Sequence, residues 1–274
     1  MSNKLQPIAI FDSGVGGLTV ARALKKLLPQ ESIFYVADTL SRPFGTKSAA
    51  ELEAILQRNL AFILSHPVKM VVIACHTACC SLSLYENLPI PVLPIFPTSL
   101  GALKDLSFLS SLLIMGTQRT IASGMYQEFL RKHYPHLKTY YIAASVLEHL
   151  IEKKCKEQKL IETTIAELVQ PLQIEAPDGV FLACTHFPIY QFFLQKMFRQ
   201  PTLVLDPAEY FSRQIYGALE SENLLNPSKE TPTDQYVVTG DLESFQEKFL
   251  CYFGETLGRS KACFSHAYAK LSGD

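Results

Sequence analysis

Two short apolar runs in different halves of the chain each end in a cysteine. Residues 71–75 read Val-Val-Ile-Ala-Cys, residues 180–184 read Val-Phe-Leu-Ala-Cys, and small or hydroxyl residues follow both. An apolar run of this length, bounded by residues that favour turns, predicts a buried strand. The chain therefore repeats a unit in which a strand delivers a cysteine, and this repeat favours a fold with two similar halves.

Strands of this kind alternate with helical segments along most of the chain. Besides the strand that carries Cys184, we expect strands at residues 7–11, 32–37, 69–74, 111–115, 140–144, 203–205 and 236–239. Helices are expected at residues 18–28, 48–64, 120–133, 145–154, 162–172, 209–224 and 244–253. This alternation predicts mostly parallel sheets covered by helices, in which ligands bind beyond the carboxyl ends of the strands.

A proline-rich stretch from Pro89 to Pro97 marks the expected crossing between two domains, because proline is excluded from helix interiors and central strands. We predict an α/β protein with two pseudo-symmetric domains, each a mostly parallel sheet flanked by helices, and an active site in the cleft between them. The first domain comprises residues 1–97 and 210–274 and carries Cys75, and the second comprises residues 98–209 and carries Cys184.

Composition limits the classes of partner. The formal net charge is −1, and no cluster of Lys and Arg offers a footprint for a phosphate backbone or an anionic membrane. We therefore expect a small-molecule substrate, no nucleic acid and no membrane. The odd count of seven cysteines, with no long apolar segment at the N-terminus, predicts reduced thiols and a cytoplasmic protein.

The chemistry expected of Cys75 and Cys184 is proton transfer at a carbon stereocentre. Two thiols on opposite sides of one ligand can remove a proton from one face and return it to the other, which predicts a racemase or epimerase. The attacking thiol must be ionised, so the site must supply positive potential, and His186 is the candidate. The remaining cysteines are expected to be small core residues; they are Cys79, Cys80, Cys155, Cys251 and Cys263.

Two other ligands fit the sequence less well. Zinc is disfavoured because Cys75-His76 and Cys184-Thr185-His186 lack the spacing of structural zinc sites. The segment 14–17, Gly-Val-Gly-Gly, follows a strand and opens a helix like a phosphate-binding loop, but it lacks the usual glycine spacing and a Walker lysine. Its backbone amides fit a small carboxylate better than a nucleotide.

The motifs taken together resemble those of the glutamate racemases, in the aspartate/glutamate racemase superfamily. They are residues 11–18 (Phe-Asp-Ser-Gly-Val-Gly-Gly-Leu), Ala37-Asp38 with Pro43-Phe44-Gly45, Ala74-Cys75 with Thr77-Ala78, Gly116-Thr117 with Thr120, and residues 184–188 (Cys-Thr-His-Phe-Pro). This resemblance implies interconversion of L- and D-glutamate without cofactor or metal, which supplies D-glutamate for peptidoglycan synthesis in a bacterial cytoplasm. The resemblance is compatible with a monomer or a homodimer.

The resemblance also implies roles for single residues. Cys75 would remove the α-proton from D-glutamate and Cys184 from L-glutamate, while Asp12, His186 and Glu152 orient or tune the thiols. The residues expected to hold the substrate are Asp12, Ser13, Phe44, Gly45, His76, Thr77, Thr185 and His186.

Three residues depart from the family pattern, which has Tyr at Phe44, Gly at Ala183 and Asn at His76. A histidine is bulkier than asparagine and can carry a positive charge. We therefore expect substrate affinity to weaken as His76 becomes protonated, and His76→Asn to raise glutamate turnover or affinity. The same departure leaves two alternatives open, a racemase of another acidic amino acid such as aspartate, or a weakly active regulatory descendant.

Overall fold

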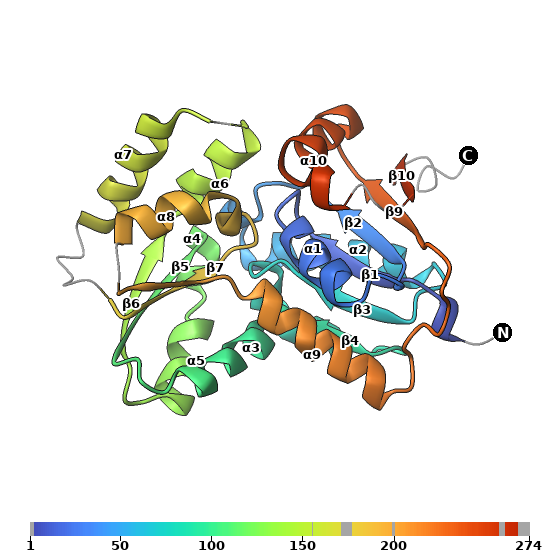
Figure 1. Cartoon of the computed structure of the whole chain (residues 1–274), viewed down its shortest axis with the longest axis horizontal. Helices are drawn as coiled ribbons and strands as arrows, with labels where there is room; N and C mark the ends of the chain where they lie inside the picture. Colours follow the sequence, from blue (N-terminus) through green and yellow to red (C-terminus); the bar gives the residue numbers. More distant parts are fainter. Residues whose placement is uncertain (1–2, 155, 171–176, 199–200, 258–260, 268–274) are drawn as a thin grey trace.

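The computed structural model describes residues 3–154, 156–170, 177–198, 201–257 and 261–267. Its larger sheet has six strands: β1 (Ile8–Asp12), β2 (Ile33–Ala37), β3 (Met70–Ile73), β4 (Val92–Pro94), β9 (Thr233–Val238) and β10 (Lys261–His266). They lie in the order β10-β9-β2-β1-β3-β4, and every pair is parallel. Helices flank this sheet, as Figure 1 shows.

The smaller sheet has four strands: β5 (Ser111–Gly116), β6 (Lys138–Ala143), β7 (Gly179–Ala183) and β8 (Leu203–Leu205). Their order is β6-β5-β7-β8, again with parallel pairs only. The predicted α/β fold with two parallel sheets is therefore confirmed. The residue boundaries of the two domains stay a prediction, although each sheet takes its strands from one of the two expected regions of the chain.

The helices are α1 (Leu18–Leu27), α2 (Ala49–Leu64), α3 (Ile95–Thr98), α4 (Gln118–Ala122), α5 (Met125–His133), α6 (Ser145–Glu152), α7 (Gln158–Val169), α8 (Gln191–Phe198), α9 (Ala208–Ser221) and α10 (Leu242–Leu257). Short 3-10 turns lie at Asn3–Leu5, Phe44–Thr46, Ala78–Tyr85, Ser99–Leu106 and Phe187–Tyr190. Helix α2 begins where Ser48 and Glu51 form a reciprocal capping box. One expected helix is split into α4 and α5, because Gly124 between them adopts a φ of 74°.

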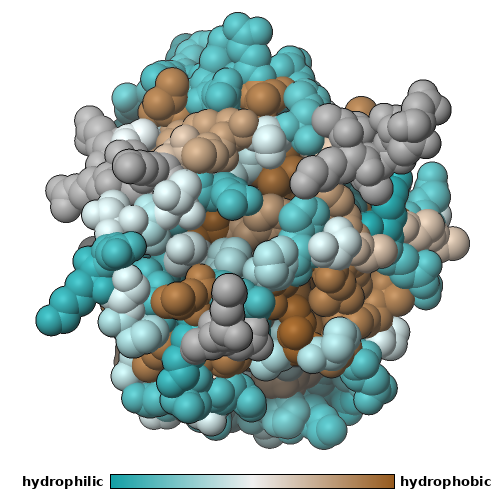
Figure 2. Space-filling view, turned by 90° about the vertical axis from the view of Figure 1, so that its right-hand side faces the viewer, coloured by the Kyte–Doolittle hydropathy of each residue, from teal (hydrophilic) through white to brown (hydrophobic). Residues whose placement is uncertain are grey.

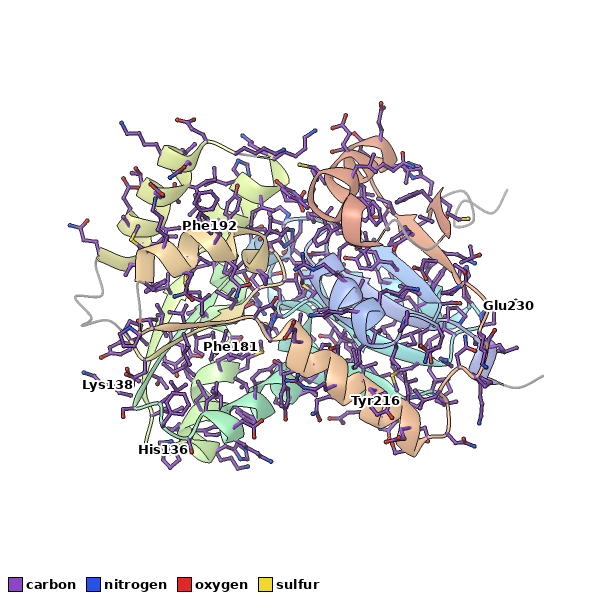
Figure 3. The ribbon with its side chains drawn as sticks, viewed as in Figure 1. His136, Lys138, Phe181, Phe192, Tyr216 and Glu230 are labelled. Carbon is purple, nitrogen blue, oxygen red and sulfur yellow. The ribbon has the colours of Figure 1, made fainter. Side chains whose placement is uncertain are left out.

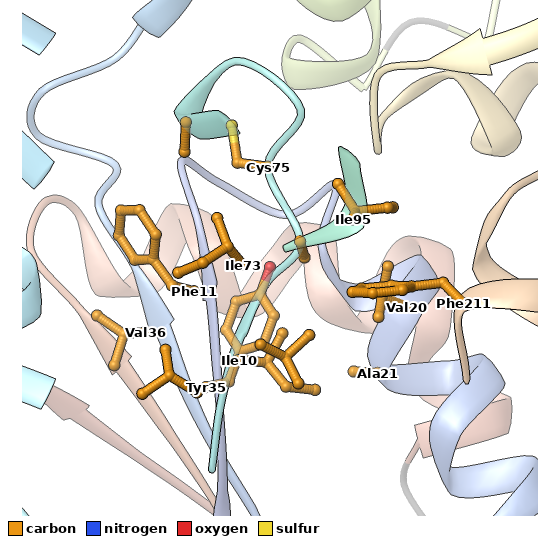
Figure 4. Packing of buried hydrophobic residues seen from close by; sticks show 14 of the residues in the cluster. Ile10, Phe11, Val20, Ala21, Tyr35, Val36, Ile73, Cys75, Ile95 and Phe211 are labelled. Atoms are coloured by element: carbon orange, nitrogen blue, oxygen red, sulfur yellow. The ribbon is translucent and has the colours of Figure 1, made fainter. Parts of the chain in front are cut away.

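Both cysteines of the repeat follow strands that lie inside a sheet. In β1, β2, β3 and β7 every residue is buried, as expected for strands covered on both faces. Figure 4 shows Cys75 at the end of β3, next to the apolar side chains that surround Ile73 and Phe11. The core of the larger sheet thus fixes the point where the backbone leaves β3 and presents Cys75.

Several sequence-based expectations need correction. The proline-rich stretch contributes an edge strand, β4, with Pro94 at its end, in addition to connecting the sheets. The strand β10 was not expected. Cys251 and Cys263 are exposed, so they are not core residues, whereas Cys79 is buried. Cys155 and residues 171–172 of an expected helix lie outside the described residues.

The surface carries mixed polarity. Figure 2 shows a face of the molecule on which hydrophobic and hydrophilic residues are interspersed. Single large apolar side chains such as Phe192 on α8, labelled in Figure 3, are exposed. Within the described ranges, none of the helices combines the length and the apolar character needed to cross a membrane.

Candidate active site

Cys75 and Cys184 line the same small cavity. The described residues of its wall are Ser13, Phe44, Gly45, Cys75, His76, Thr77, Thr117, Glu148, Cys184, Thr185 and His186. Both cysteines are only 5% exposed. The structure therefore brings together all the residues expected at the site except Asp12 and Glu152, which lie behind the wall and contact it. A larger cavity lies elsewhere, beside α1 and β8, and contains neither thiol.

Cys75 lies beside the hydroxyl of Ser13, and the carboxylate of Asp12 acts on it. Its thiol donates to Ser13 Oγ at 3.8 Å. Burial raises the pKa of Cys75 well above its ordinary value, and the negative charge of Asp12 raises it further. This thiol is therefore held in the protonated form, as a proton donor requires.

Cys184 has the opposite environment, because a histidine lies beside it. The Cys184 sulfur is 3.9 Å from His186 Nδ1, and His186 Nε2 is 2.8 Å from Glu152 Oε1. Burial lowers the pKa of His186, but contacts with Cys184 and Glu152 outweigh burial and raise this pKa well above its ordinary value. Burial also raises the pKa of Cys184, while His186 opposes that rise. The imidazolium is the positive potential that a Cys184 thiolate needs.

Glu152 connects this pair to the larger sheet. Its carboxylate lies 2.5 Å from Arg42 Nη1 and 3.0 Å from Lys248 Nζ, in addition to His186. Burial opposes ionisation of Glu152, but His186, Arg42 and Lys248 together lower its pKa strongly, so the carboxylate stays ionised. Tyr252, one turn after Lys248 on α10, donates to the Ile151 carbonyl at 2.8 Å. Helix α10 and the Arg42 loop thus hold α6 against the site.

Asp12, the last residue of β1, is fully buried and does not reach the cavity wall. Its carboxylate accepts hydrogen bonds from the Gly14 amide at 2.9 Å and the Thr185 hydroxyl at 3.0 Å. Burial raises the pKa of Asp12 to about 6, against the opposing effects of His186 and these donors. Asp12 therefore joins the glycine loop of the larger sheet to the segment that follows Cys184.

The glycine loop is packed against residues of the smaller sheet. A Cβ atom at Gly16 would lie 2.5 Å from Thr185 Oγ1 and 2.8 Å from His186 Cε1. The hydroxyl of Thr19 at the start of α1 donates to the Thr185 carbonyl at 3.3 Å. These contacts leave no room for a phosphate at Gly16, and they explain why the loop requires glycine there.

His76 is held by a single hydrogen bond. Its Nδ1 lies 2.6 Å from the hydroxyl of the buried Tyr126, and the ring of Phe181, which is labelled in Figure 3, packs edge-on against it. Burial lowers the pKa of His76 to about 3, so its imidazole is neutral at physiological pH. The sequence left a positive charge at His76 open, and burial, which the sequence does not reveal, disfavours that charge.

The tautomer of His76 depends on its partner. The two atoms share one proton, and the arrangement in which Tyr126 donates to Nδ1 leaves the proton of the neutral ring on Nε2. This Nε2 is buried and has no hydrogen-bond partner among the described residues. In this tautomer, His76 is a residue of the cavity wall that carries an unpartnered hydrogen-bond donor.

Three hydroxyls form a cluster between the two sheets. Thr77 Oγ1 lies 2.9 Å from Thr117 Oγ1 and 3.1 Å from Thr120 Oγ1, and the last two are 2.9 Å apart. Thr77 and Thr117 are on the cavity wall. Since each hydroxyl both donates and accepts, the cluster can direct a proton toward an anionic group in the cavity.

Sequence reasoning missed five residues of this arrangement, namely Arg42, Thr117, Tyr126, Glu148 and Lys248. The sequence contained an indication for two of them. Thr117 directly follows an expected strand, and Glu148 precedes Glu152 by one helical turn, which places both on one face of the helix. Within the described part of the chain, no three His, Cys, Asp or Glu side chains are grouped so that they could hold a metal ion.

The chain is similar to known racemases over most of its length. A family model described as Asp/Glu/Hydantoin racemase matches residues 19–214. A glutamate racemase from Carboxydothermus hydrogenoformans is 33% identical over 258 residues, which cover 92% of this chain and 94% of that protein.

Solved structures give the same result. The glutamate racemase isoform RacE1 from Bacillus anthracis has a TM-score of 0.88 at 27% identity, covering 96% of this chain and 97% of that one. A Francisella tularensis glutamate racemase in complex with D-glutamate has a TM-score of 0.85 at 25% identity, with the same two coverages. An aspartate racemase from Picrophilus torridus is more distant, with a TM-score of 0.60 at 18% identity over 78% of this chain.

Proposed function

Because the chain belongs to the Asp/Glu/hydantoin racemase family, we propose that it interconverts L- and D-glutamate through its two thiols. The relatives that match it over nearly their full length are glutamate racemases. The single observation that carries the mechanism is that Cys75 and Cys184 line one cavity at the ends of β3 and β7.

In this mechanism one sulfur removes the α-proton and the other delivers a proton to the opposite face. With L-glutamate, the Cys184 thiolate takes the proton while the Cys75 thiol protonates the other face, which leaves Cys75 as the thiolate. D-glutamate is then the product, and the reverse reaction starts from Cys75. The surroundings of the two thiols support these roles, since His186 favours the thiolate of Cys184, whereas the charge of Asp12 favours the protonated form of Cys75.

The carbanion-like state places negative charge on the substrate's α-carboxylate. Hydrogen-bond donors fixed in a water-excluded cavity stabilise such charge without reorganisation. The Thr77 and Thr117 hydroxyls and the Nε2–H of His76 are available for this purpose. The chain thus supplies acid, base and charge stabilisation from its own side chains.

The alternatives to glutamate are less well supported. The aspartate racemase from Picrophilus torridus, at 18% identity, is similar to this chain in fold. A regulatory descendant without chemistry would not need the ion pairs that keep Glu152 and His186 charged. The supply of D-glutamate for peptidoglycan, a cytoplasmic location and a homodimer are the physiological predictions that accompany this function.

A turnover assay over glutamate, aspartate and their amides tests the proposal. We expect both glutamate enantiomers to be racemised, with equal kcat/KM because the equilibrium constant between enantiomers is one, and aspartate to be a poor substrate. Efficient turnover of aspartate without glutamate would establish the alternative substrate. Absence of turnover with glutamate binding intact would establish the regulatory alternative.

A further inference from the structure

Glu148 is a buried carboxylate for which the protein provides no partner. It lies in the first turn of α6, is 7% exposed and belongs to the cavity wall. None of the residues that the structure describes donates a hydrogen bond to its carboxylate or forms an ion pair with it. Glu152, one turn later on α6, has three cationic neighbours. The protein therefore neutralises one of these two carboxylates and leaves the other open to the cavity.

An unpaired carboxylate in a closed site is unfavourable, because burial removes its hydration and no opposite charge compensates for the loss. A ligand cation that enters the cavity would supply that charge. Every amino acid brings such a cation in its α-ammonium group. The features of Glu148 thus point to a ligand of this class.

The other acidic residue expected at the substrate, Asp12, is already engaged by protein donors. Its two oxygens already accept from Gly14 and Thr185, and it lies behind the cavity wall. Glu148 is the one carboxylate among the described residues of that wall. Glu148 is therefore the carboxylate that the cavity wall itself presents to a substrate ammonium.

We propose that Glu148 binds the α-ammonium group of the substrate and is a specificity-determining residue of this racemase. The proposal rests on the proposed function and extends it to the binding mode. The unpartnered Nε2–H of His76 completes the arrangement, because a zwitterionic ligand needs a donor for its carboxylate as well as an anion for its ammonium. Glu148 and His76 thus define complementary contacts for the two ends of the zwitterion.

The negative charge of Glu148 also connects substrate binding with the ionisation of the Cys184 thiol. The negative charge of Glu148 acts on Cys184 and contributes to the raised pKa of that thiol, after burial. An ammonium group paired with Glu148 cancels this charge. Substrate binding therefore favours the Cys184 thiolate at the moment when it is needed.

The test compares a ligand that has the ammonium with one that lacks it. Glutarate keeps both carboxylates of glutamate but has no amino group. Binding of glutamate and glutarate is measured by calorimetry for the wild-type protein, for Glu148→Gln and for a matched control, Glu128→Gln. Glu128 also lies in the first turn of a helix, α5, but is exposed and remote from the cavity wall.

We expect Glu148→Gln to weaken glutamate binding by about ten-fold or more, the loss typical of a hydrogen bond to a charged group. The same variant should bind glutarate more tightly than the wild type does, because the repulsion between carboxylates is removed. Glu128→Gln should change neither affinity. Glu148→Asp, which keeps the charge, should retain more glutamate affinity than Glu148→Gln, with far-UV circular dichroism confirming that both variants fold.

Tighter binding of both ligands to Glu148→Gln would overturn the proposal, since it would place a substrate carboxylate against Glu148. Unchanged binding of both would also overturn it. Because these are binding measurements, they remain informative if glutamate is bound but not racemised, so failure of the binding mode and failure of the proposed activity are distinguishable.

Discussion

Gly16→Ala should inactivate the enzyme without unfolding it. The new Cβ would lie 2.5 Å from Thr185 Oγ1 and 2.8 Å from His186 Cε1, and it would lie still closer to His186 Nδ1. Ordinary van der Waals contact begins at 3.4 Å, so these side chains must move by roughly 1 Å. His186 is the group that lies beside Cys184, and its displacement separates the thiol from its positive partner.

The expected magnitude follows from this displacement. A misplacement of about 1 Å at a reacting group can reduce turnover by about 100-fold, equivalent to about 2.7 kcal/mol of transition-state stabilisation. Overpacking of one methyl group costs about 1–3 kcal/mol of folding stability, which a protein of this size tolerates. We therefore expect a soluble variant with a lowered melting temperature and about 1% of the wild-type kcat/KM.

The assay is the change of optical rotation or circular dichroism from each glutamate enantiomer, with thermal unfolding as the measure of stability. Gly217→Ala is the matched control, because Gly217 lies within α9 and a Cβ there would meet nothing within 4 Å. It should keep full activity and gain up to about 1 kcal/mol from helix propensity. Gly16→Ala with activity within about two-fold of wild type would refute the claim that the loop positions His186.

Three further predictions concern single residues. Cys75→Ser and Cys184→Ser should each abolish racemisation, since a serine hydroxyl is too weak an acid to exchange roles with a thiolate. Each variant should still catalyse elimination of chloride from one enantiomer of a β-chloro amino acid. Near-normal racemisation by either variant contradicts the assignment. Burial raises the pKa of Asp12 from 3.8 to about 6, so the folded state holds this proton more tightly and the free energy of unfolding should fall by about 2 kcal/mol as pH rises from 4 to 7. Asp12→Asn should remove this dependence in thermal unfolding scans, and an unchanged pH profile counts against it. His76→Asn keeps an acceptor and a donor, but the shorter side chain cannot place the donor where Nε2 lies while it still accepts from Tyr126, so we expect kcat/KM to fall by about ten-fold with no added pH dependence between pH 6 and 9. A rise in turnover would support the expectation from the sequence instead.

The parts of the fold that the sequence predicts are those whose signal is local. The strands β1, β2, β3 and β7 are apolar runs with many β-branched residues, because both faces of each strand are buried. Strand β10 has the mixed sequence Lys-Ala-Cys-Phe-Ser-His and pairs only with β9 at the edge of the sheet. An edge strand needs neither an apolar run nor strict alternation, so periodicity does not identify it.

The two thiols were predictable for a similar reason, since the repeat of strand and cysteine is visible in the sequence. The charges around them were not. Arg42 and Lys248 contact Glu152 from segments about a hundred residues away on either side, and only the assembled fold brings them together. The neutrality of His76 likewise depends on burial beside Tyr126 and Phe181, which no local pattern encodes.

The transfer of hydrogen in deuterium oxide tests the two-thiol account most directly. The enzyme is incubated with L-glutamate in this solvent, and the first few per cent of D-glutamate is isolated and analysed for deuterium at Cα by mass spectrometry. If Cys184 removes the proton and Cys75, exchanged with solvent, delivers another, the early D-glutamate carries deuterium almost completely. Early D-glutamate that retains substantial protium would mean that one group returns the proton it removed, and would contradict the assignment of two thiols.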